Sequence, residues 1–324
     1  MGAVASASAG EGDGPAGYPA VVRYGINGSG RMLTSGVAGV LEDMGAAEAA
    51  GFSSYWVAQV GLTDALTIIG GHGDTGSPME LGTAVISTWE RHPHALATQA
   101  LTVQSLVGER LVVGIGVNHR PHVEQSLRQE WRKPVRHVLD YLDILQELLA
   151  TGRASHQGEV WSFDGEAARP SAGVPKVMLA ALGPQMLQVA GRRTDGTILW
   201  CVGPRTVRTH IAPVINEAAA AADRPPPAIV CSLPVWVTDD PAPARQFLAT
   251  ILADYAQLPS YRAMMDIEGV EGLGDLSIVG DEDEVREAIT EIEQAGATDF
   301  TPVPMGGNPD EEARTMAVLR DAMG

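Results

Sequence analysis

Residues 80–119 read ELGTAVISTWERHPHALATQALTVQSLVGERLVVGIGVNH, and this segment carries the clearest signal of the fold class. It begins with an apolar, β-branched run at residues 81–86 and ends with a second apolar run at residues 111–115. Between the two runs, apolar residues recur at three- and four-residue steps, which predicts a helix with the core positions Leu96, Ala100, Val103 and Val107. Two buried strands joined by a helix are typical of the right-handed crossover unit of parallel α/β folds.

The same alternation continues on both sides of this stretch. Counting apolar runs gives eight strands, at residues 21–26, 52–57, 81–86, 111–115, 177–181, 197–201, 229–237 and 300–303. Eight strands alternating with helices favour a (β/α)8 TIM barrel with insertions over an open doubly wound sheet, and 324 residues suit this fold. We therefore predict a disordered tail at residues 1–20 and a single barrel domain at residues 21–324, in which residues 241–275 form a lid or insertion.

Composition excludes several functional classes. The chain holds 22 Lys and Arg against 40 Asp and Glu, and this net charge of −18 argues against nucleic-acid binding. No apolar run approaches the roughly 18 residues of a membrane span. Two cysteines, Cys201 and Cys231, give no disulfide framework, which favours a cytoplasmic protein. No metal is expected, since the pairs His92/His94 and His119/His122 lack suitably placed acidic partners.

Residues 91–137 depart from this acidic balance, with seven Lys and Arg against three acids. Such a basic region could attract an anionic ligand, or it could be one solvated helical face. The turn at residues 181–186 could bind the phosphate of such a ligand. Gly183 permits close approach, Pro184 suits the first helical turn, and the free N–H groups of a helix N-terminus favour anions. An ordinary loop between a strand and a helix would show the same sequence pattern.

Several motifs in order resemble the luciferase-like flavin and deazaflavin oxidoreductases, most of all the members that use coenzyme F420. They are ELGTAV, the RHP of residues 91–93, the run TxQxLxGERLVVGIGVNH, AALGPQML at residues 180–187 and DGTILW at residues 195–200. The resemblance spans residues 23–305. It implies a bacterial luciferase-like barrel, a cofactor across the C-terminal ends of the strands, a small-molecule substrate and a homodimer.

The resemblance also implies roles for individual residues. It places a non-proline cis peptide at Ala84–Val85 and a flat cofactor ring against it. The cofactor-binding residues carried over are Trp56, Gln59, Thr83, Ala84, Val85, Gly116, Val117, Asn118, Leu182, Gly183, Pro184, Gln185 and Met186. Asn27 is a substrate or ring contact. His119 stands where sugar-phosphate dehydrogenases of the family have a glutamate, so we take His119 as the catalytic acid and expect a different substrate. Trp56 could instead be plain core.

The predicted function is hydride transfer between F420 and a small organic substrate. The alternative is an FMN-dependent two-component monooxygenase, and a third interpretation is a cofactor carrier or regulator without turnover. An apolar or aromatic substrate is suggested by residues of the 241–275 segment, although a helix core would use the same residue types: Tyr255, Leu258, Tyr261, Met264 and Met265.

Overall fold

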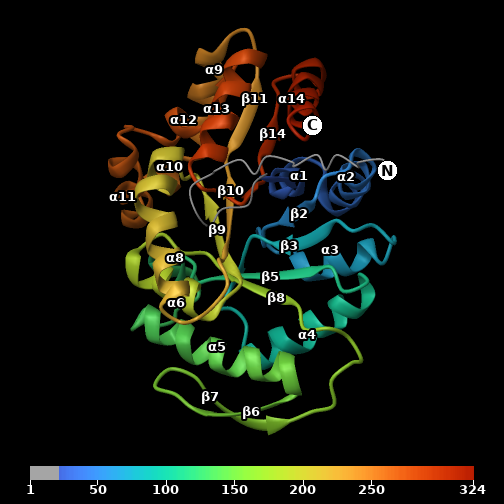
Figure 1. Ribbon diagram of the computed structural model, residues 1–324, viewed down its shortest axis with the longest axis vertical. Helices are drawn as coiled ribbons and strands as arrows, with labels where there is room; N and C mark the ends of the chain where they lie inside the picture. The colour runs from blue at the N-terminus through green and yellow to red at the C-terminus, as the bar shows by residue number, and fades with distance from the viewer. Residues whose placement is uncertain (1–21) are drawn as a thin grey trace, which may run out of the picture.

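Eight parallel strands close into a barrel in the computed structural model, which describes residues 22–324 (Figure 1). The strands are β1 (Arg23–Asn27), β2 (Ser54–Val57), β3 (Glu80–Thr83), β5 (Leu111–Gly116), β8 (Lys176–Leu179), β9 (Gly196–Trp200), β10 (Ala228–Ser232) and β13 (Asp299–Phe300). Pairing of β3 with β5 closes the cylinder, and a short strand β4 (Ile86–Ser87) continues β3 along β5. The predicted (β/α)8 barrel is therefore confirmed, while the predicted tail at residues 1–20 lies outside the described residues.

Helices connect the strands and cover the outside of the barrel (Figure 1). The main ones are α2 (Gly36–Ala50), α3 (Ala65–His72), α4 (Pro93–Leu106), α5 (Pro134–Thr151), α6 (Pro184–Arg193), α8 (Ala212–Ala220), α13 (Glu282–Gln294) and α14 (Pro309–Asp321). Local signals set their starts: Asp64 accepts the Thr67 N–H at the beginning of α3, and Asp281 with Glu284 forms a capping box on α13. Within residues 22–324, none of the helices is long and apolar enough to span a membrane.

Three elements predicted as continuous are divided. The helix predicted at residues 32–50 is α1 (Ser29–Thr34) followed by α2; Ser35 lies between them, and Gly36, the first residue of α2, has φ +63°. The helix predicted at residues 205–222 consists of α7 (Pro204–Thr206), the π-helix η2 (Val207–Ile211) and α8. The strand predicted at residues 229–237 ends at Ser232 and resumes as β11 (Pro234–Val237). These breaks depend on local backbone geometry, which apolar periodicity does not report.

A second, smaller sheet extends beyond the barrel. Its three parallel strands are β12 (Ile278–Gly280), β11 and β14 (Val303–Met305), in that order. Strand β12 has no counterpart in the sequence prediction. The predicted insertion is a series of four helices, the α9–α12 segment: α9 (Pro241–Ile251), α10 (Ala253–Ala256), α11 (Pro259–Glu268) and α12 (Leu273–Leu276).

A hairpin lies at the other end of the molecule from α9 (Figure 1). It pairs β6 (Arg153–Gln157) with β7 (Ser162–Glu166) and packs against α5. The segment HQGEVWSFDG at residues 156–165 resembles a short hairpin that the family inserts before the next barrel strand, and the pairing of β6 with β7 agrees with it. Before α5, the loop that follows β5 contains a short π-helix, η1 (His122–Ser126), where the sequence predicted a loop with some helix.

The barrel interior is layered. Its N-terminal end carries the ion pairs Arg23–Asp299 and Arg23–Glu80, with Lys176 also on Glu80. The middle layer is an apolar cluster of its own, separate from the main core between strands and helices: Trp56, Val112, Met178, Ile198 and Val230. Ion pairs thus fill the N-terminal end of the barrel and an apolar layer, called the apolar floor, fills its middle. The C-terminal end of the strands, called the mouth from here on, is where barrels of this kind bind their ligands.

Candidate functional site

The inner wall of the mouth is built from backbone and small side chains. A Cβ added to Gly114 would lie 1.9 Å from the Thr83 carbonyl oxygen. A Cβ added to Gly116 would lie 2.8 Å from Val85 Cγ2 and 3.4 Å from Ala180 Cβ. Glycine is therefore required where these strands approach one another, and the layer above the apolar floor contains no large side chain at β5.

The peptide bond between Ala84 and Val85 is cis, as the resemblance predicts. It joins β3 to β4, and both residues are half-buried beside the apolar floor. The preceding residue fixes the position of this connection: the Thr83 hydroxyl donates to the Gly114 carbonyl at 2.8 Å and accepts the Gly114 N–H at 2.9 Å. Thr83, Ala84, Val85 and Gly116 therefore lie together, which their order in the sequence alone does not require.

Trp56, Asn27 and Gln59 make their hydrogen bonds within the protein. Trp56 is 1% exposed, its indole N–H donates to the Ser54 hydroxyl at 2.9 Å, and its ring belongs to the apolar floor. The Asn27 amide donates to Ser232 Oγ at 2.8 Å and accepts the Ser29 N–H. Gln59 accepts from the Arg91 guanidinium. Trp56 is thus buried next to the cis peptide, and its predicted contact with a cofactor ring stays a prediction.

The turn after β8 presents an open helix N-terminus. Gly183 is the N-cap residue of α6, with φ −79°, and a Cβ there would meet nothing within 4 Å. Gly183, Pro184 and Gln185 are exposed, and the first turn of α6 carries no acidic residue. The Leu182 carbonyl is fixed by the His210 Nε2–H at 2.8 Å. Free N–H groups and the helix dipole make this turn suitable for an anion.

His119 lies half-buried just beyond the end of β5, after Val117 and Asn118. The Asn118 side chain accepts the His119 N–H at 2.7 Å and donates to Glu90 at 3.0 Å, which ties this loop to the one after β4. Burial first, and then the charge of His122, hold the pKa of His119 below its ordinary value. The imidazole is therefore neutral at neutral pH and can accept a proton.

Ser87 is a candidate site residue that the sequence reasoning missed. It ends β4 opposite Gly116 and is 8% exposed. Its hydroxyl has no hydrogen-bond partner within the described part of the chain, which is unfavourable for a buried polar atom. Apart from its position three residues after Ala84, nothing in the sequence separates Ser87 from an ordinary strand serine.

The basic region at residues 91–137 does not form one anion-attracting surface. Five of its seven cations pair with carboxylates: Arg91 with Asp64, Arg110 with Glu48, Arg120 with Glu124, Lys133 with Glu159 and Arg136 with Asp140. Arg110 is buried and also donates to the Met79 carbonyl just before β3, at the end of the barrel opposite the mouth. The local surplus of positive charge is thus distributed over both ends of the barrel and largely neutralised.

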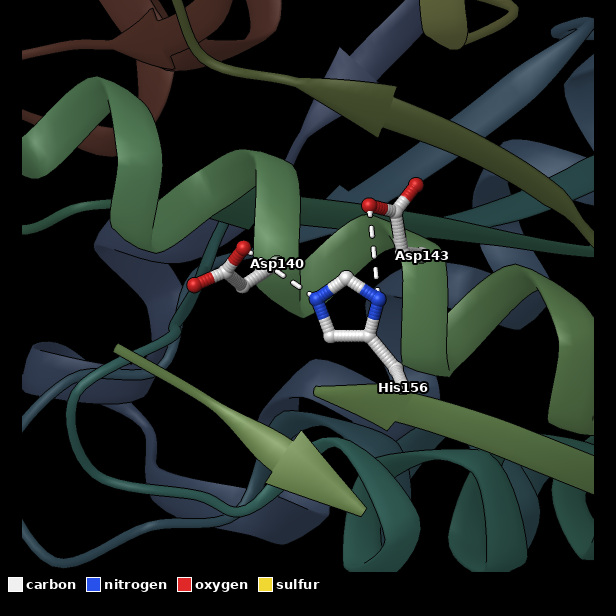
Figure 2. Close-up of side chains that lie close together, drawn as sticks. All are labelled: Asp140, Asp143 and His156. Atoms are coloured by element: carbon white, nitrogen blue, oxygen red, sulfur yellow. Dashed lines mark hydrogen bonds and ion pairs between the residues drawn. The ribbon is translucent and has the colours of Figure 1, made fainter. Parts of the chain in front are cut away.

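Asp140, Asp143 and His156, called the Asp140 cluster, could in principle hold a metal ion, with Asp140 and Asp143 on α5 and His156 on β6 (Figure 2). Their oxygens already have partners. Asp140 pairs with Arg136 at 2.5 Å and accepts the Val160 N–H at 2.8 Å, while Asp143 pairs with Arg193 at 2.5 Å. These donors neutralise both carboxylates, so the cluster is better described as the anchor that fastens the β6–β7 hairpin to α5.

Known proteins resemble this chain in sequence and in fold. A putative coenzyme F420-dependent oxidoreductase of Mycobacterium tuberculosis is 29% identical, over 86% of this chain and 93% of its own length. The F420-dependent tetrahydromethanopterin reductase of Methanopyrus kandleri has the same fold, with TM-score 0.76 and 18% identity over 94% of this chain and 98% of the other. The FMN complex of 3,6-diketocamphane monooxygenase from Pseudomonas putida gives TM-score 0.71 and 17% identity, over 93% and 96%.

The two solved structures show the fold alone at such low identity. The sequence model of the luciferase-like monooxygenase family extends over residues 26–299, from the end of β1 to the beginning of β13. This range contains the cis peptide, Ser87, His119 and the turn before α6. The chain therefore belongs to the luciferase-like monooxygenase family.

Proposed function

We propose that this protein is an F420-dependent oxidoreductase that transfers a hydride between coenzyme F420 and a small organic substrate. The observation that carries the proposal is the mouth itself: a wall of glycine and alanine above an apolar floor, with one unpartnered buried hydroxyl, beside an open helix N-terminus. The similarity to a putative F420-dependent oxidoreductase over most of both chains supports this choice of cofactor.

The residues at the mouth fit a planar heterocycle with an anionic tail. A ring next to Ala84, Val85 and Gly116 would meet backbone and methyl groups, and a polar atom on that ring would satisfy the Ser87 hydroxyl. The free N–H groups at the beginning of α6 suit a phosphate, and the turn from Leu182 to Met186 would hold it. The half-buried residues Val117 and Asn118 would border the ring.

The bound cofactor would supply two-electron hydride chemistry. This chain would supply position, exclusion of water and a proton acceptor. His119 is neutral near pH 7 because burial lowers its pKa, so it is ready to take the proton of a substrate hydroxyl and to return it in the reverse direction. The predicted role of His119 as an acid thus belongs to the reverse direction of the same reaction.

An FMN-dependent monooxygenase is the second candidate, and the FMN-bound diketocamphane monooxygenase with the same fold favours it. Cofactor titration separates the two. Purified protein would be titrated with F420 and, separately, with FMN, and binding followed by fluorescence quenching. We expect saturation by F420 and none by FMN, and turnover that does not consume oxygen. Saturation by reduced FMN alone, with oxygen-dependent turnover, would reverse the assignment. F420 binding without turnover of any alcohol or ketone would instead favour a carrier.

Ser87 offers a sharper test of where the ring binds. Ser87→Ala removes a hydroxyl with no partner among residues 22–324, so the melting temperature should be unchanged or higher. The same substitution should weaken F420 binding by roughly tenfold, because one hydrogen bond to the ring is lost. Thr83→Val is the matched control, and it should lower the melting temperature because Thr83 makes two hydrogen bonds to Gly114.

A further inference from the structure

Three aromatic rings from separate parts of the chain meet at the mouth. His119 follows β5, Tyr255 lies on α10 and Tyr261 lies on α11. Ring centroids are 5.8 Å apart for His119 and Tyr255, 5.9 Å for His119 and Tyr261, and 5.2 Å for the two tyrosines. All three pairs are T-shaped, with interplanar angles of 89°, 62° and 72°. The α9–α12 segment thus contacts the proposed proton acceptor directly, through ring edges and faces.

The surroundings of this ring cluster are apolar. Tyr261 packs with buried residues of the α9–α12 segment and with the end of β9: Cys201, Leu252, Met265, Leu273 and Leu276. Two half-buried residues of the mouth, Leu182 and Trp200, pack against the same cluster and connect it with the turn before α6. A molecule that reaches His119 from this side therefore meets hydrocarbon and ring surface.

No cation on these two helices is available to an anionic substrate. The only basic residue in α10 or α11 is Arg262, which is exposed and pairs with Asp266 at 3.1 Å. Burial raises the pKa of Tyr255 and of Tyr261, and the nearby Cys201 thiol adds to both shifts, so the hydroxyls stay neutral. Within residues 22–324, neither hydroxyl has a hydrogen-bond partner, which leaves both free for one polar group on a ligand.

We propose that Tyr255 and Tyr261, with His119, form the substrate-binding wall of this site, and that it selects a neutral aromatic or alicyclic alcohol or carbonyl compound over a phosphorylated one. Edge-to-face packing against Tyr255 would hold the ring of the substrate. A phosphate would lie beside phenols and hydrocarbon with no cation on α10 or α11 to neutralise it, which is unfavourable. The proposal rests on the proposed function, because it assigns a substrate class to the same site.

The test uses two probes that differ only in a phosphate: 1-naphthylmethanol and 1-naphthylmethyl phosphate. Their dissociation constants would be measured by calorimetry on the purified full-length protein. We expect the alcohol to bind roughly tenfold more tightly or better, because neither α10 nor α11 offers the phosphate a counter-charge. Equal affinity, tighter binding of the phosphate, or no saturable binding of either probe would overturn the proposal.

Variants locate the binding surface. Tyr255→Ala should weaken binding of the alcohol by roughly tenfold, whereas Tyr255→Phe keeps the ring and should keep most of the affinity. Phe247→Ala is the matched control: it removes another half-exposed ring from the same segment, on α9, where that ring contacts Trp236. It should leave the affinity unchanged. An equal loss in Phe247→Ala and Tyr255→Ala, or no loss in a folded Tyr255→Ala, would contradict the assignment.

Two further measurements distinguish a failure of the substrate proposal from a failure of the proposed function. Thermal melting reports whether each variant folds. If Tyr255→Ala does not fold, the affinity of Tyr255→Phe and the affinities of the wild type for the two probes still test the proposal. F420 titration of the same samples tests the proposed function independently. Normal F420 binding with no preference for the neutral probe refutes the substrate class alone, whereas a clear preference without F420 binding refutes the cofactor assignment alone.

Discussion

His137 should make the stability of this protein fall steeply below neutral pH. Its ring is fully buried on α5 and stacks on Trp89, with centroids 3.9 Å apart. The Trp161 indole N–H can only donate, so His137 Nδ1 at 3.2 Å accepts, and the proton on Nε2 faces Thr88 Oγ1 at 2.9 Å. Both nitrogens are satisfied in the neutral form. Burial lowers the pKa of His137 to about 4.

The magnitude follows from the difference between folded and unfolded states. An unfolded histidine has a pKa of about 6.5. Between about pH 6.5 and 4, the unfolded chain therefore binds a proton at this residue while the folded chain does not. Acidification then favours unfolding, and stability is retained above pH 6.5. With these two values, the free energy of unfolding falls by about 2 kcal/mol between pH 7.5 and pH 5 because of His137 alone.

The assay compares wild type with His137→Gln, which cannot titrate. Urea unfolding at several pH values between 7.5 and 5 would be followed by tryptophan fluorescence. Wild type should lose about 2 kcal/mol more than the variant over this range, although the variant starts less stable because it loses the ring stacking. His94→Gln replaces an exposed histidine on α4 and should behave like wild type. Parallel pH profiles for wild type and His137→Gln would refute the reasoning.

Three other predictions follow from local geometry. Gly114→Ala should destabilise the fold by about 3 kcal/mol or more, because its Cβ would lie 1.9 Å from the Thr83 carbonyl oxygen. Gly183→Ala is the control and should leave the melting temperature unchanged, because a Cβ there meets nothing within 4 Å. Equal melting temperatures for the two variants would contradict this reasoning. Asp64→Ala should cost about 1 kcal/mol in urea unfolding, since it removes the N-cap of α3, and an unchanged midpoint would exclude that role. Zinc or EDTA should not shift the melting temperature through the Asp140 cluster, and stabilisation by zinc would show that its arginine partners can be displaced.

Much of the fold could be predicted because its signals are local. Fully apolar runs marked the barrel strands, three- and four-residue apolar spacing marked the helices between them, and Asp64 marked a helix start. The resemblance of ELGTAV to a family motif was enough to place a cis peptide at Ala84–Val85. Gly116 was predicted to contact the cofactor, which stays a prediction; the structure shows that a side chain at Gly114 or Gly116 would collide with a neighbouring segment.

The candidate site could be predicted only in part. Ser87 was missed, because its unsatisfied hydroxyl results from closure of the barrel around it and not from a motif. Trp56 was predicted either to contact the cofactor ring or to be plain core; its side chain packs in the apolar floor, and the contact with the ring stays a prediction. The basic region was expected to leave a surplus of positive charge, but its partners are supplied by distant elements, such as Glu48 for Arg110.

The strands, the helices and the strand ends at which a ligand could bind follow from the order of the residues alone, because periodicity, capping and glycine act over a few residues. Only the tertiary structure brought Tyr255 and Tyr261 against His119, more than a hundred residues away along the chain. It also buried His137 between tryptophans and paired the arginines. These contacts depend on the register and closure of eight strands, which fix distances between segments that no local pattern relates.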